Sequence, residues 1–116
     1  MPSRSDDRLY LAQMLDMSRK VVVRAEGLTR DRYDSDEDLR LALLHLVQII
    51  GEAARRVSGP GRAAHPDIPW KAITGMRNKI VHDYINVDFG ILYDVATKDI
   101  PALAGTLEKL DLPEDL

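Results

Sequence analysis

The chain contains no cysteine, and its 116 residues include only one phenylalanine and one tryptophan. Without cysteine it has neither a disulfide framework nor a thiolate metal site. With so few large aromatic side chains, the core has to be built from aliphatic residues, a composition that favours helices over strands. The length suits one domain, so we expect a single helical domain over residues 1–116.

Long apolar runs are also absent. The first residues contain no apolar signal core, and no stretch reaches the ~20 apolar residues that span a bilayer. The longest apolar run, residues 41–50, is interrupted by His45 and Gln48. We therefore expect a soluble, cytoplasmic protein with no membrane partner.

The chain has no excess of positive charge: its net charge is −3. That total argues against a protein that holds nucleic acid by bulk charge. Residues 55–80 nevertheless form a basic zone of six bases and one acid, Asp67; the bases are Arg55, Arg56, Arg62, Lys71, Arg77 and Lys79. Such a zone would attract a ligand that carries phosphate. A solvated charged surface explains the charges equally well.

Apolar periodicity predicts a first helix over 6–28 and a second over 36–57, with a charged connector at 29–34 and Ser35 as a cap. The middle of the second helix is apolar almost all round, more than one partner helix can cover. We therefore expect this helix to form both the centre of a bundle and a dimer interface. The sequence Ser58-Gly59-Pro60-Gly61 predicts a stop, followed by a loop over 62–69.

A third helix is expected from Pro69 through Tyr84, with Ile73, Met76, Ile80 and Val81 as its buried stripe. A fourth should begin after 86–88, Pro101 should break or kink the chain, and residues 100–110 should form the last helix. The predicted fold is an all-α bundle of four or five helices that dimerises.

Arg77, Asn78, His82 and Tyr84 form the only polar cluster with evident chemistry. On an ideal helix Arg77 and Tyr84 point within ~20° of each other, whereas Arg77 and His82 diverge by ~140°. A cleft completed by another element or chain would reconcile the two directions, although structural ion pairs and helix-end roles are the commoner explanation. His45 and His65 lack the spacing of a metal site, and we interpret them as a core or interface histidine and a loop histidine.

The sequence resembles a known family at several places. Arg77-Asn78-Lys79-Ile80-Val81-His82-Asp83-Tyr84 fits the R-x4-H-x-Y motif of the HepT-like proteins in the HEPN superfamily. The stretches Ile49–Ala54, Ile68–Lys71 and 86–103 are also similar in order and spacing, while the first helix matches only in character. The resemblance therefore covers most of the chain.

The resemblance implies a HEPN-type helical homodimer that acts as an endoribonuclease without a metal or other cofactor, the toxin of a type VII-like toxin–antitoxin pair. Its family partner is a minimal nucleotidyltransferase of the MntA type, which neutralises the toxin by transferring AMP to the motif tyrosine, here Tyr84. Arg77 and His82 would be catalytic, and Asn78 would position the substrate. Glu52 is a candidate support for the site, with an ordinary surface glutamate as the alternative.

These side chains suit the chemistry. RNA can be cut without metal when its 2′-hydroxyl attacks the adjacent phosphate, because an imidazole such as that of His82 can move protons near neutrality. The guanidinium of Arg77 can stabilise the phosphate charge. Two other readings stay open: a catalytically inactive HEPN-type dimer that serves only as partner or substrate of the nucleotidyltransferase, and a plain helical interaction module.

Overall fold

The computed structural model describes residues 4–83 and 85–112. The elements in chain order are α1 (Arg4–Ala25), α2 (Arg30–Asp34), α3 (Glu37–Arg56), α4 (Gly59–Ala64), α5 (Trp70–Ile80), α6 (Phe89–Asp94), the π-helical turn η1 (Val95–Asp99) and α7 (Ile100–Leu107). Within the described residues, the pairing between Val81 and Val87 is the only β-bridge outside helices. The predicted all-α fold class is confirmed.

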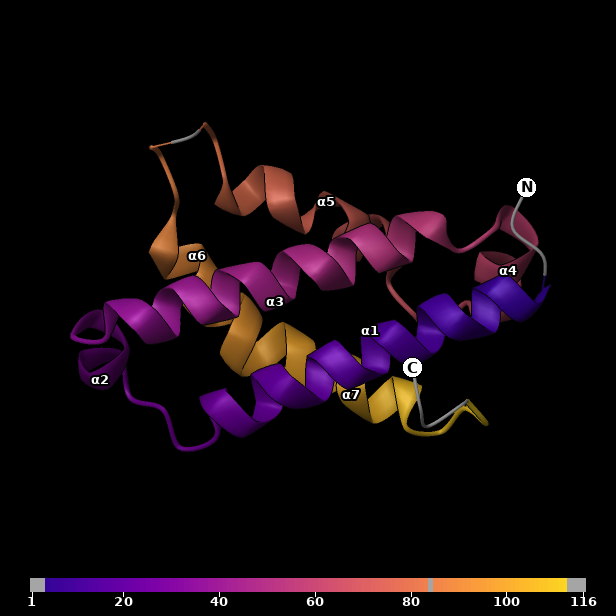
Figure 1. Cartoon of the computed structure of the whole chain (residues 1–116), viewed down its shortest axis with the longest axis horizontal. Helices are drawn as coiled ribbons and strands as arrows, with labels where there is room; N and C mark the ends of the chain where they lie inside the picture. Colours follow the sequence, from indigo (N-terminus) through magenta and orange to yellow (C-terminus); the bar gives the residue numbers. More distant parts are fainter. Residues whose placement is uncertain (1–3, 84, 113–116) are drawn as a thin grey trace.

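Helix α3 runs through the middle of the bundle (Figure 1). It packs against α1 on one side and α5 on the other, and α7 packs against α1. The short helices α2 and α4 lie at opposite ends of α3, where the chain turns back. This arrangement leaves a strip of α3 uncovered between its two long neighbours.

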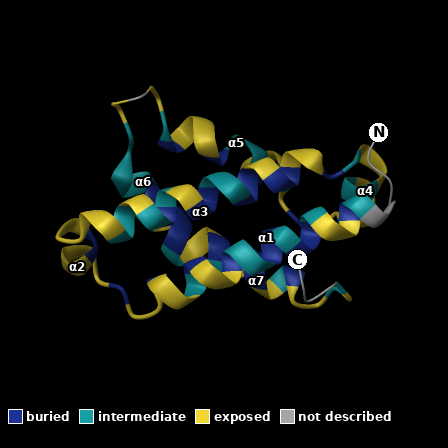
Figure 2. Ribbon diagram, in the orientation of Figure 1, coloured by how far each residue is buried: buried dark blue, intermediate teal, exposed yellow. Residues whose placement is uncertain are grey.

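The core is aliphatic, as the composition predicts. Buried positions recur every three or four residues along each long helix, so each contributes one stripe to a shared interior (Figure 2). Full burial of such a side chain typically stabilises the fold by ~1.5–3 kcal/mol. The predicted stripe of α5 is confirmed at Ile73, Met76 and Ile80, while Val81 is half-buried. Other members include Leu11, Met14, Val21, Leu43, Val47, Ile50, Leu92, Ile100 and Leu107.

Two short helices replace segments predicted as connectors. Thr29 caps α2 by accepting a hydrogen bond from the backbone N–H of Arg32 at 3.2 Å. Asp36, rather than Ser35, caps α3. Val57 is the C-cap of α3, and Ser58 starts the next helix, because its hydroxyl accepts from the N–H of Gly61 at 3.0 Å. The expected stop is therefore correct, but α4 follows it immediately where a loop was predicted.

Pro101 does not interrupt the helical chain. The residues from Phe89 to Leu107 stay helical through the π turn η1, in which the N–H of Ile100 donates to the carbonyl of Val95. In an α-helix the ring of Pro101 would collide with the carbonyl four residues earlier. The wider turn just before the proline removes that collision. The change expected at Pro101 therefore takes the form of a π turn rather than a full break, and the last helix begins at Ile100 as predicted.

No helix in the described part of the chain combines the length and the apolar character that crossing a bilayer requires.

Candidate active site

The helix that carries Arg77 and Asn78 ends before it reaches His82. Helix α5 stops at Ile80, and Val81 is extended, with φ −108° and ψ 107°. The carbonyl of Ile80 accepts from the N–H of Asp88 at 2.7 Å, and Val81 pairs with Val87. Pairing between these two segments of the same chain thus replaces the next helical hydrogen bonds. The prediction of one helix through Tyr84 is wrong, and the helical angles do not apply beyond Ile80.

His82 lies at the base of a hairpin loop, residues 81–87, which projects from the bundle (Figure 1). Its N–H donates to the carbonyl of Asn86 at 2.9 Å. The carboxylate of Asp83 accepts from the N–H groups of Ile85 and Asn86 at 2.9 Å and from the side-chain amide of Asn86 at 2.7 Å. These hydrogen bonds, first that of Ile85, lower the pKa of Asp83. The backbone around His82 is therefore fixed by local bonds.

An aromatic cluster anchors the chain just after this loop. The hydroxyl of Tyr33 in α2 donates to the carbonyl of Phe89 at 2.6 Å, and the guanidinium of Arg40 lies 5.4 Å from the Phe89 ring centre. Tyr93 packs edge-on against Tyr33 and donates to the carbonyl of Leu28 at 3.0 Å. Burial raises the pKa of Tyr33 to about 12. Sequence reasoning missed this anchor; a lone tyrosine in a charged segment was its only signal.

Arg77, Asn78 and His82 are all exposed. Within the described residues, no side-chain hydrogen bond or ion pair joins these three. Tyr84 lies outside the described residues. The guanidinium of Arg77 and the imidazole of His82 are thus each available to an external ligand.

Glu52 does not reach these residues. Its carboxylate forms ion pairs with Arg55 at 3.7 Å and Arg56 at 3.8 Å on its own helix, and its side chain is 56% exposed. In the described chain no hydrogen bond links it to Arg77 or His82. The structure therefore favours the ordinary surface glutamate over the supporting role.

The uncovered strip of α3 consists of Leu41, His45, Gln48 and Glu52, which we call the outer stripe. Their spacing of four, three and four places them on one face. Leu41 is 49% exposed and His45 is also exposed. Of the two roles expected for His45, the core role is wrong, because α1 and α5 cover only the flanks of α3; the interface role stays a prediction.

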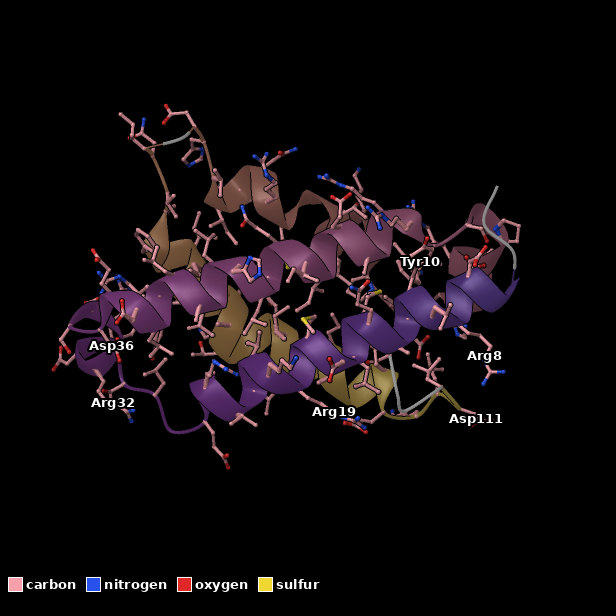
Figure 3. The ribbon with its side chains drawn as sticks, in the orientation of Figure 1. Arg8, Tyr10, Arg19, Arg32, Asp36 and Asp111 are labelled. Carbon is pink, nitrogen blue, oxygen red and sulfur yellow. The ribbon has the colours of Figure 1, made fainter. Side chains whose placement is uncertain are left out.

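Part of the basic zone is structural. The guanidinium of Arg62 donates to the carbonyls of Ala54 and Arg55, at 3.3 and 3.1 Å, at the end of α3. It also lies 6.0 Å from the ring centre of Trp70, whose indole N–H donates to the carbonyls of Arg62 and His65. Figure 3 shows how the side chains surround the helices.

Arg55 is likewise engaged, because its guanidinium donates to the carbonyl of Thr74 at 3.0 Å. Of the six bases, only Lys71, Arg77 and Lys79 are exposed without a partner in the described chain. Arg77 and Lys79 point ~160° apart around α5. The bases of this zone therefore do not form one continuous positively charged surface.

Comparison with known sequences identifies the family. The sequence profile of the family described as "Ribonuclease HepT-like" matches residues 11–110. The chain belongs to the ribonuclease HepT-like family. It is 31% identical to a "Putative RNase" of Caldanaerobacter subterraneus subsp. tengcongensis, over 89% of this chain and 92% of that protein.

Two further relatives are archaeal. The chain is 26% identical to a "Putative RNase" of Methanocaldococcus jannaschii, over 91% of this chain and 97% of that protein. It is 37% identical to the "Probable ribonuclease HepT" of Thermococcus cleftensis, over 65% of this chain and 68% of that protein. No solved structure is a significant match to the chain.

Membership of the HepT-like family makes the chain a ribonuclease, with RNA as its substrate. The match begins at residue 11 and ends at residue 110, so it includes all of α3, α5 and the hairpin loop. In the described part of the chain, no three histidine or acidic side chains converge on a common point.

Proposed function

We propose that this protein is a metal-independent endoribonuclease, the toxin of a toxin–antitoxin pair, and that Arg77 and His82 perform the reaction. The observation that supports this best is the availability of both groups. Arg77 is exposed in the last turn of α5, and His82 is exposed at the base of the hairpin loop five residues later. Neither side chain has a hydrogen-bond partner in the described chain.

The proposed reaction is a transesterification. The 2′-oxygen of a ribose bonds to the adjacent phosphorus while the bond from phosphorus to the 5′-oxygen breaks, leaving a 2′,3′-cyclic phosphate. His82 moves a proton, either from the 2′-hydroxyl or to the departing 5′-oxygen. Arg77 binds the non-bridging oxygens as charge accumulates on them. Asn78, beside Arg77 on α5, holds the substrate.

A homodimer would supply what one chain lacks. Within the described residues of one chain, Arg77 and His82 make no contact with each other, and a cleft shared by two copies would place Arg77 of one copy beside His82 of the other. The outer stripe of α3 is the surface we assign to the contact between copies. It is open, and it combines the exposed Leu41 with the polar side chains of Gln48 and His45.

A complementation experiment tests the shared cleft. His82→Ala and Arg77→Ala chains are purified separately, then unfolded, mixed and refolded together. If one site takes Arg77 from one copy and His82 from the other, part of the activity returns on mixing. If both groups come from the same copy, the mixture stays inactive and the shared cleft is wrong.

Control of the activity is proposed to act through Tyr84. A minimal nucleotidyltransferase would transfer AMP from ATP to the phenolic oxygen of this tyrosine, two residues after His82; the bond between the α- and β-phosphates of ATP breaks and pyrophosphate leaves. Its neighbour Ile85 is 89% exposed, so the loop is accessible to another protein. The attached AMP would add negative charge and bulk where the RNA backbone has to approach. Mass spectrometry after co-expression should find the added AMP on Tyr84; neutralisation without modification would contradict this route.

The reaction is tested with single-stranded RNA in the presence of EDTA, with DNA of the same sequence as a control substrate. We expect the RNA alone to be cut. His82→Ala should slow cutting by ~10²–10⁴-fold, the usual contribution of acid–base catalysis. Arg77→Ala should abolish cutting. Both variants should melt at the temperature of the parent protein, because both side chains are exposed.

Lys79→Ala is the matched control for charge. It removes an exposed base from the same helix, on the flank that points ~160° away from Arg77. It should therefore cut RNA at nearly the normal rate. A normal rate for either His82→Ala or Arg77→Ala would show that the assigned mechanism is wrong.

The second candidate is a catalytically inactive helical dimer that serves only as the substrate or partner of the nucleotidyltransferase. The net charge of −3 and the lack of contact between Arg77 and His82 within one chain favour it. It predicts AMP on Tyr84 but no cutting of any RNA. The two assays together separate the candidates.

A further inference from the structure

A groove with a volume of about 520 Å³ lies between α5 and the continuous helix made by α6, η1 and α7. Its lining is largely apolar and includes the buried side chains of Ile73, Met76, Val95 and Leu103. The volume falls within the ~300–1,000 Å³ range of sites that hold a ligand. Neither Arg77 nor His82 lines it. The groove is thus a second surface, separate from the candidate active site.

The charged residues that line this groove are mostly acidic. They are Asp67, Asp94 and Asp99, against the single base Lys79. Asp94 pairs with Lys98 at 3.7 Å, but both side chains are at least 60% exposed, and such pairs contribute little. Asp67 and Asp99 have no ion-pair partner in the described part of the chain. An apolar floor with a net negative rim selects for a partner that is apolar with basic borders.

The π turn helps to shape the groove. Val95 and Asp99, the first and last residues of η1, both contribute to the lining. An extra residue in a helical turn widens the helix and redirects its side chains, and such turns are frequent at functional sites. Here the turn brings an apolar and an acidic side chain to the same surface.

The groove lies on the flank of α5 opposite to Arg77. Ala72 and Lys79, which line it, are seven residues apart and so share one face of α5. Arg77 points ~160° away from Lys79 around the helix axis. A molecule bound in the groove therefore leaves the Arg77 flank open to RNA.

We propose that this groove is a docking site for an amphipathic helix of another protein, with apolar residues at i, i+3, i+4 and i+7 and Lys or Arg at the borders of that face. The eleven residues of α5 span ~16 Å, which matches about three turns of a helix laid alongside. Helices that bind in grooves use this spacing of anchors. The outer stripe of this chain does not fit, since its exposed apolar Leu41 shares the face with Glu52.

The test uses a synthetic helical peptide of about four turns, with leucines at the anchor positions, lysines at the borders and a fluorescent label. Its binding to the full chain is followed by fluorescence anisotropy. A peptide with glutamates in place of the lysines is the matched control. We expect the basic peptide to bind at least tenfold more tightly than the acidic one, and its binding to weaken as salt is added.

Variants of the chain locate the site. Ala72→Lys places bulk and positive charge at an exposed position in the groove and should weaken binding about tenfold or more. Asp94→Asn and Asp99→Asn should each weaken it a few-fold, the range for an exposed ion pair. Ala63→Lys adds the same side chain on α4, outside the groove, and should bind normally. Ala72→Lys should also cut RNA at the normal rate.

Three results would overturn the proposal. Equal binding of the basic and acidic peptides would remove the charge argument. Unchanged binding by Ala72→Lys would place the peptide elsewhere on the protein. A change in the oligomeric state of Ala72→Lys, measured by sedimentation, would mean that the groove is instead covered by a second copy of the chain. None of these results depends on whether Arg77 and His82 cut RNA, so the proposed reaction is tested separately. The third result would also contradict the assignment of the contact between copies to the outer stripe.

Discussion

Replacing Tyr33 by phenylalanine removes one oxygen atom, and that atom ties α2 to the segment that follows the hairpin loop. The Tyr33 side chain is fully buried, and its hydroxyl donates to the carbonyl of Phe89 at 2.6 Å. Phe89 is the first residue of α6, so its carbonyl keeps a helical hydrogen bond when the hydroxyl is removed. The loss of the tyrosine hydrogen bond therefore costs ~0.5–1.5 kcal/mol. For a domain of this length each kcal/mol lowers the melting temperature by roughly 3–6 °C, so we expect Tyr33→Phe to melt about 2–9 °C lower at neutral pH.

The difference between the two proteins should depend on pH. Burial raises the pKa of Tyr33 to about 12, whereas an unfolded tyrosine titrates near 10. Because the folded pKa is the higher one, the stability linked to this group is complete below pH 10 and is lost as the pH rises toward 12. A separation of about two pKa units amounts to on the order of 2–3 kcal/mol. Tyr33→Phe cannot titrate, so the two stability curves should converge in this window.

Urea denaturation at several pH values between 7 and 11.5 measures both effects. At each pH the free energy of unfolding of Tyr33→Phe is subtracted from that of the parent protein. The contribution of lysine titration is common to both proteins and cancels in this difference. Tyr93→Phe is the control, because its half-buried hydroxyl donates to the carbonyl of Leu28 over a longer distance, 3.0 Å, and a smaller loss is expected. Equal stability of Tyr33→Phe and the parent at pH 7 would refute the anchor. A constant difference up to pH 11.5 would refute the titration argument.

Three other substitutions test separate parts of the structure. Asp83→Ala should slow RNA cutting by loosening the hairpin loop. Hydrogen bonds, first that from the N–H of Ile85, hold the pKa of Asp83 below its ordinary value, so in the parent protein the amide NMR signals of the loop should shift only at pH values below the range in which an ordinary aspartate titrates. Leu41→Glu should dissociate the proposed dimer in sedimentation, while Val23→Glu, at an exposed position of α1, should not. Gly61→Ala should lower the free energy of unfolding by ~1–3 kcal/mol in urea titrations, because the added methyl group would collide with the carboxylate of Asp7 in α1, which is held by hydrogen bonds from Ser58. In Gly59→Ala the added methyl group meets nothing within 4 Å, so this control should be neutral.

The parts of the fold that follow from local pattern could be predicted. The second helix was expected over 36–57 and is found at Glu37–Arg56, since acids in its first turn and Ser58 after its end mark both limits. Ile73, Met76 and Ile80 are buried as their spacing predicts. Both results depend on residues within one or two helical turns of each other, where sequence spacing determines geometry.

The parts that depend on distant residues could not be predicted. Residues 77–84 read as a continuing helix, but α5 ends because the chain pairs with residues 87 and 88 further along. Arg62 counts as a free base in the sequence, yet in the fold it completes the end of α3. In each case the deciding partner is a backbone group brought close by tertiary structure, and no local pattern specifies it.

Helix α5 separates the two surfaces that this protein offers. Its buried side holds Ile73, Met76 and Ile80, one flank carries Arg77, and the other flank, with Ala72 and Lys79, lines the groove. A substitution on either flank can therefore change one surface without touching the other, because the core side lies between them. Substitutions on the buried side would disturb both surfaces at once. A partner that docks in the groove therefore leaves free the flank from which Arg77 would reach the RNA.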